Sequence, residues 1–146
     1  MKLSHISLTA RDANSLSAFY KYVFGFIDRR AAKRISGKAV SRGNGLNNSN
    51  IYSIWLTLPD DEGPFLEIME YSETIERRLP MVNEPGYGHL AFEVRNLNET
   101  IKTVLQHGGA LQGQITNFGT DAKPHLLVYV RDSEGNILEL EQVRAE

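Results

Sequence analysis

Two nine-residue stretches decide the fold of this chain: DDEGPFLEI at residues 60–68 and DSEGNILEL at residues 132–140. Five of the nine positions are identical, and Glu67 matches Glu139. In both stretches acidic residues and a glycine precede an apolar alternation, which is typical of a hairpin turn that leads into a strand. The repetition at an interval of 72 residues predicts two copies of one structural module.

A second repeated pair lies upstream of each of these stretches. Residues 4–12 read SHISLTARD and residues 88–96 read GHLAFEVRN, so that His5 matches His89. Each stretch alternates like a strand and is followed by an amphipathic helical pattern, the first opened by Asp12 and the second by Asn96. Further strand-like segments lie near 26–35, 50–58 and 64–71 in the first copy and near 110–117, 123–131 and 136–143 in the second.

These patterns predict an α+β fold made of two tandem βαβββ modules. We expect one domain over residues 1–146, with module 1 at 1–71, a linker at 72–86 and module 2 at 87–146. The extra length of module 1 lies mainly in residues 36–50, a polar, Gly/Asn-rich stretch that is typical of a loop.

The composition excludes several functional classes. The chain has 146 residues, no cysteine and a net charge of −2. Without cysteine there is no disulfide, thiol nucleophile or zinc-thiolate site, and the charge argues against a nucleic-acid partner. No apolar run approaches the ~20 residues of a membrane span, and the N-terminus does not resemble a signal peptide. We therefore expect a cytoplasmic protein with a small-molecule substrate.

Strand parity gives the repeat a chemical meaning. Side chains alternate between the two faces of a strand, so His5 and His89 point away from their apolar neighbours, as do Glu67 and Glu139. If the apolar faces pack under the helices, all four side chains lie on the opposite face. Two neutral imidazoles and two carboxylates suit a divalent first-row metal. The pattern predicts a metal site of His5, Glu67, His89 and Glu139, whereas His107, at a helix end beside Gly108, suits a capping role.

The motifs resemble the vicinal oxygen chelate superfamily, also called the glyoxalase I/bleomycin resistance protein/extradiol dioxygenase superfamily. Beyond the histidine and glutamate strands, the resemblance rests on FYKYVFGF at residues 19–26 and covers essentially the whole chain. It implies curved mixed sheets around a cavity, with a metal that chelates two neighbouring substrate oxygens. The order His, Glu, His, Glu is most like bacterial glyoxalase I, the lactoylglutathione lyase.

The resemblance implies a metal-dependent isomerase or lyase. Its cofactor would be a divalent ion (Ni, Zn, Co, Fe or Mn), and carboxylates would move a proton beside a carbonyl, with Glu139 as the first choice of base and Glu67 as its partner. Methylmalonyl-CoA epimerases typically place glutamine where Glu67 stands. Glutathione-using members tend to carry an arginine where this chain has Thr9 and an asparagine where it has Tyr71, so a substrate without glutathione is credible.

Two other functions remain open from the sequence. One is a non-catalytic drug- or metabolite-binding protein of the bleomycin-resistance type, which would not need the four ligands. The other is a non-haem iron extradiol-type dioxygenase, which would consume oxygen.

Two further features bear on partners. No acidic residue occurs between Arg29 and Pro59, whereas six basic ones do, and this run is either a solvated surface or a rim that attracts anions. Each module has sheet edges that need pairing or covering, and in the superfamily modules join edge to edge within one chain or between chains. We expect a homodimer, with module swapping left open.

Overall fold

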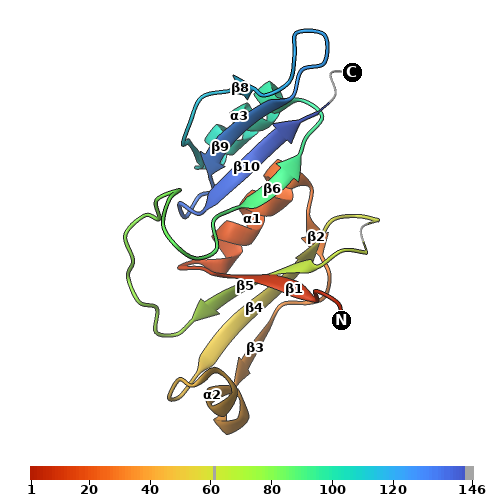
Figure 1. Ribbon diagram of the computed structural model, residues 1–146. Coiled ribbons are helices and arrows are strands. Elements are labelled where there is room, and N and C mark those ends of the chain that lie inside the picture. The colour runs from red at the N-terminus through yellow and green to blue at the C-terminus, as the bar shows by residue number, and fades with distance from the viewer. Residues whose placement is uncertain (61, 144–146) are drawn as a thin grey trace. The chain divides into compact units, whose positions relative to one another are not determined.

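The computed structural model describes residues 1–60 and 62–143, which form two compact units divided between Glu76 and Arg77. Figure 1 traces the chain through both. The boundary falls inside the predicted linker. Each unit contains one mixed sheet and one long helix, so the α+β architecture with two βαβββ-like modules is confirmed. The expectation that both form a single domain stays a prediction.

The first unit follows the order expected from the sequence, except that its second strand is divided and is followed by a short helix. Its elements are β1 (His5–Thr9), α1 (Ala13–Phe24), β2 (Ile27–Asp28), β3 (Lys33–Ser36), α2 (Lys38–Asn44), β4 (Asn50–Thr57) and β5 (Phe65–Tyr71). The strand order is β1-β5-β4-β2, with β3 also paired to β4. Strands β1 and β5 run parallel, and the other pairs are antiparallel.

The second unit repeats this topology. Its elements are β6 (Leu90–Glu93), α3 (Leu97–Gln106), β7 (Ala110–Leu111), β8 (Thr116–Asn117), β9 (Leu126–Arg131) and β10 (Ile137–Gln142). The strand order is β6-β10-β9-β7, with β8 also paired to β9, and β6 runs parallel to β10. The equivalent positions of the two sheets therefore hold the repeated sequence motifs.

The helix ends form as the sequence predicts. Asp12 accepts a hydrogen bond from the backbone N–H of Ser15 at 2.8 Å, and α1 ends at Gly25, whose φ of 74° is left-handed. Asn96 caps α3 in the same way through the N–H of Glu99, at 3.1 Å. The carboxylate of Glu99 itself accepts a hydrogen bond from the Lys102 ammonium on the next turn of α3.

The apolar face of each sheet packs under its helix. Helix α1 contacts β4 and β5, and α3 contacts β9 and β10. Fully buried side chains fill these layers; they include Leu16, Phe19, Tyr20, Leu56 and Ile68 in the first unit and Leu97, Val104, Val128, Leu138 and Leu140 in the second. Burial on this scale contributes roughly 1.5–3 kcal/mol for each large apolar side chain. The opposite face of each sheet is left for the polar residues of the candidate site.

Two local expectations from the sequence were wrong. The second strand expected in each module is divided into two short ones, β2 with β3 and β7 with β8. The stretch 36–50 is not wholly a loop, because residues Lys38–Asn44 form the helix α2, which ends at Gly45 with a φ of 78°. Among the described residues, no helix is long and apolar enough to cross a membrane.

Candidate metal-ligand pairs

In each unit, one histidine and one glutamate lie close together on the face of the sheet opposite the helix. In the first unit the Nε2 atom of His5 lies 3.5 Å from Oε2 of Glu67, and in the second Nε2 of His89 lies 3.5 Å from Oε2 of Glu139. The glutamate side chains are 12% exposed in both units, and the histidines are 43% and 35% exposed. Each histidine thus lies beside the glutamate of its own unit, and the role of these four residues as metal ligands stays a prediction.

The parallel strand pairs bring these residues together. His5 opens β1 and lies beside Phe65 of β5, two residues before Glu67. The imidazole of His5 stacks on the Phe65 ring, with centroids 5.0 Å apart. His89 comes one residue before β6, next to Leu90, which pairs with Leu138 of β10. The parallel pairing of the first and last strands thus brings a histidine close to a glutamate in each unit.

An aromatic hydrogen-bond donor lies across the sheet from each glutamate. Trp55 pairs with Glu67 in the β4–β5 register, and Tyr129 pairs with Glu139 in the β9–β10 register. The indole Nε1–H of Trp55 donates to Oε1 of Glu67 at 2.8 Å. Tyr129 is hydrogen-bonded to Glu139, which, with burial, raises the pKa of the Tyr129 hydroxyl. Neither aromatic residue is among those that the sequence pattern predicted for the site.

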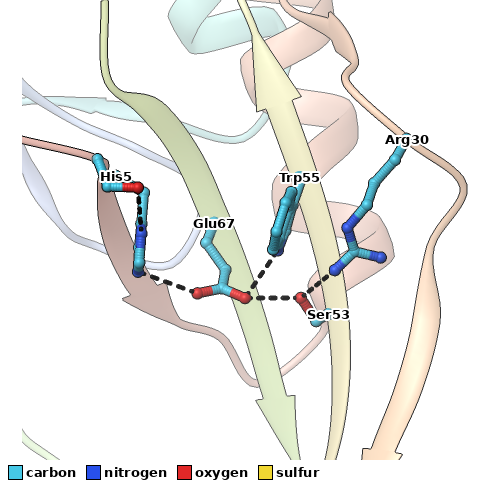
Figure 2. Close-up of polar contacts among 6 residues, drawn as sticks. His5, Arg30, Ser53, Trp55 and Glu67 are labelled. Atoms are coloured by element: carbon cyan, nitrogen blue, oxygen red, sulfur yellow. Dashed lines mark hydrogen bonds and ion pairs between the residues drawn. The ribbon is translucent and has the colours of Figure 1, made fainter.

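The first glutamate has a second donor that belongs to a longer chain of contacts. The buried Ser53 donates its hydroxyl to Oε1 of Glu67 at 2.8 Å and accepts from Nη2 of Arg30 at 3.3 Å. The guanidinium of Arg30 also lies 3.9 Å above the Trp55 ring. Figure 2 shows these side chains in one row, with Oε2 of Glu67 facing His5.

The second glutamate has an acidic neighbour instead. Glu141 follows Glu139 by two residues on β10 and lies 2.9 Å from Nε2 of His125. The hydrogen bond with His125 is the main reason why the pKa of Glu141 is lowered. The surroundings of Glu67 and Glu139 thus differ, although the His/Glu distances agree.

Two arginines of the basic run between Arg29 and Arg42 lie over aromatic rings. The Arg29 guanidinium lies 5.0 Å from the Phe65 centroid, and that of Arg34 lies 5.4 Å from the Tyr52 centroid. Arg29 and Arg34 are nevertheless exposed. Both interpretations of the run, a solvated surface and a rim that attracts anions, therefore stay predictions.

A polar cavity occupies another part of the first unit. It measures about 480 Å³, and its lining comes entirely from residues within 36–50, including Lys38, Ser41 and Asn50. The cavity is therefore separate from His5 and Glu67.

The predicted four-residue site is only partly tested by these contacts. Among residues 1–60 and 62–143, no group of three or more His, Cys, Asp or Glu side chains is gathered closely enough to hold a metal ion. Each unit brings together two of the predicted ligands, and the metal-binding cavity stays a prediction.

Comparison with known proteins identifies the family. The model of the glyoxalase/bleomycin resistance protein/dioxygenase superfamily matches residues 2–140. The chain belongs to this superfamily. The sequence-based assignment is thereby confirmed at the level of the superfamily.

Individual members of the superfamily resemble this one at low identity. The human mitochondrial methylmalonyl-CoA epimerase is 22% identical over 141 residues, which cover 97% of this chain and 73% of the epimerase. A glyoxalase family protein from Bacillus cereus superposes with a TM-score of 0.85 at 21% identity, covering 97% and 93% of the two chains. Glyoxalase I from Zea mays superposes with a TM-score of 0.66 at 15% identity. The match covers 99% of this chain and 45% of the maize chain. These structural likenesses establish the fold.

Proposed function

We propose that the protein is a metal-dependent isomerase or lyase that moves a proton next to a carbonyl group. The observation that carries this proposal is the recurrence of one His/Glu pair, with Nε2 and Oε2 3.5 Å apart, at equivalent places of both sheets. A binding protein of the bleomycin-resistance type would have no need to keep such a pair twice.

The donor set fits a divalent first-row metal. Ligands at 2.0–2.2 Å from a shared ion lie roughly 3.0–3.5 Å from each other, which is close to the spacing in each pair. His5 and Glu67 would supply two ligands, and His89 and Glu139 the other two. When bound, the ion would act as a Lewis acid on the substrate oxygens. Nickel, zinc, cobalt, iron and manganese all accept this donor set.

The proton transfer itself would fall to the glutamates. Glu139 would take the proton from the carbon beside the carbonyl as the C–H bond breaks, and would return it to the adjacent carbon or to the same one. Glu67 would be its partner and remain a ligand. Return to the adjacent carbon gives a glyoxalase-type isomerisation, whereas delivery of a proton to the opposite face of the same carbon, from a second proton donor, gives an epimerisation.

Two substrate classes follow from these two outcomes. A hemithioacetal of a 2-oxoaldehyde fits the glutamate at position 67, which resembles glyoxalase I. A branched acyl thioester fits the similarity to methylmalonyl-CoA epimerase and the absence of the glutathione-associated residues at Thr9 and Tyr71.

A direct assay separates the two classes. Metal-loaded protein is incubated in D₂O with methylglyoxal plus glutathione, with methylglyoxal plus a small thiol, or with a methylmalonyl thioester. We expect one substrate to be converted, with turnover abolished by a chelator and restored by metal. Conversion that persists in metal-free protein, or oxygen consumption with a catechol, would contradict the proposal.

We also propose that the protein works as a homodimer, because each module has sheet edges that need pairing or covering. The second pair comes either from the same chain or from a second copy. Mixing His5→Ala and His89→Ala chains distinguishes the two sources. If the pairs come from different chains, one site in each mixed dimer is intact, and about half the wild-type activity per mixed dimer returns.

If each chain builds its own site, no mixed dimer regains activity. Light scattering at micromolar concentration is the necessary companion measurement. A monomeric mass in the active preparation would contradict the dimer.

A further inference from the structure

Glu67 is held by two hydrogen-bond donors on the neighbouring strand β4. Oε1 of Glu67 accepts hydrogen bonds from the Ser53 hydroxyl and the Trp55 indole, both at 2.8 Å, while Oε2 faces His5. Resting on the proposed function, we propose that Ser53 and Trp55 are positioning residues that fix Glu67 as a stationary metal ligand with Oε2 presented to the ion. Arg30 orients Ser53 for this task.

The direction of each hydrogen bond in the row is determined by chemistry. A guanidinium and an indole N–H can only donate. Ser53 must therefore accept from Arg30, which leaves its single hydroxyl proton for Glu67. Trp55 likewise has no alternative to donating. Both donors converge on one oxygen atom, so the lone pairs of Oε2 remain available for a cation (Figure 2).

Burial makes these bonds costly to break. The Ser53 side chain is fully buried, and Glu67 is 12% exposed, so water cannot readily replace either donor. The ring of Trp55 is itself clamped, because the Arg30 guanidinium lies 3.9 Å above it and the Phe65 ring lies 4.4 Å away, centroid to centroid. Turning the Glu67 carboxylate would forfeit two hydrogen bonds to a charged group, which are the strong kind.

The second unit has no counterpart of this arrangement at the equivalent positions. Leu127 stands two residues before Tyr129, where Ser53 stands two residues before Trp55. Leu127 pairs with Glu141, and Ser53 pairs with the uncharged Met69. Glu139 thus has a tyrosine and a neighbouring carboxylate where Glu67 has a serine, a tryptophan and a nearby guanidinium. Of the two glutamates, only Glu67 therefore has this serine and tryptophan pair of donors.

Metal affinity provides the test, since it does not depend on knowing the substrate. Zinc affinity is measured by competition with a chromophoric chelator for the wild type, Ser53→Ala and Trp55→Phe, each also made in a Glu67→Ala background. We expect Ser53→Ala and Trp55→Phe each to weaken zinc binding about 10- to 100-fold, as the loss of groups that orient ligands does. In the Glu67→Ala background, neither change should weaken binding further.

Tyr52→Phe is the matched control. It removes a hydroxyl from the same strand, β4, but that hydroxyl donates to Oδ1 of Asn14, 3.3 Å away, and not to Glu67. It should leave the zinc affinity unchanged. An equal loss of affinity from Trp55→Phe in both backgrounds would show a general structural role and overturn the inference. Wild-type zinc affinity in both Ser53→Ala and Trp55→Phe would overturn it too. If Glu67→Ala loses affinity in that case, the proposed function still stands. If Glu67→Ala itself binds zinc like the wild type, the proposed function fails, and this inference fails with it.

Discussion

Glu139→Gln should lower turnover about 10²- to 10⁴-fold, while metal binding falls much less. The amide can still offer an oxygen to the ion, but it cannot accept the substrate proton, and the loss of a general base typically has an effect of this size. Single-turnover and steady-state rates on the substrate identified by the D₂O assay provide the measurement, with metal content determined on the same samples.

Glu99→Gln is the matched control for this change. Glu99 lies on α3, its side chain is 64% exposed, and it pairs with Lys102. The control should turn over like the wild type. Should Glu139→Gln retain the wild-type rate with metal bound, the base lies elsewhere, and Glu67 becomes the next candidate.

The repeated motifs allowed much of the fold to be predicted. The strand period of two places His5 and Glu67 on the face opposite the buried Leu66 and Ile68, and this alternation needs no knowledge of tertiary structure. The helix ends at Asp12 and Asn96 were also readable, because capping is a local interaction.

The neighbours of the glutamates were not predictable in the same way. Trp55 meets Glu67, and Tyr129 meets Glu139, only because of the registers of β4–β5 and β9–β10. The aromatic residue and the glutamate lie 12 residues apart in the first unit and 10 in the second, so a fixed repeat interval hides their equivalence. Aligning the two hairpins separately on each side of the turn would have revealed the two aromatic donors.

Local composition misled the interpretation of residues 36–50. Glycine, serine and asparagine favour loops, yet Lys38–Asn44 closes into a short helix with no buried residue. Hydrogen bonds from Ser49 to Ser41 and Asn44 hold the following segment against it. These contacts bridge up to eight residues, a separation that a search for helical or strand periodicity does not detect.

His89→Ala should remove most of the bound metal. The proposed centre uses two imidazoles and two carboxylates, so this change deletes one of four ligands and leaves Glu139 without its partner at 3.5 Å. Even changes that only disturb ligand orientation lower metal affinity 10- to 100-fold, and we expect the loss of a ligand to exceed about 100-fold. The His89 side chain is 35% exposed, so its truncation should leave the fold intact.

His107→Ala is the matched control, because His107 is the C-cap residue of α3 and not one of the proposed ligands. The most direct measurement is elemental analysis of the wild type, His89→Ala and His107→Ala after equilibration with a divalent metal and removal of the excess. The four-ligand centre predicts about one ion per chain in the wild type and in His107→Ala, and little or none in His89→Ala. Equal metal content in the two variants, or none in the wild type, would contradict it.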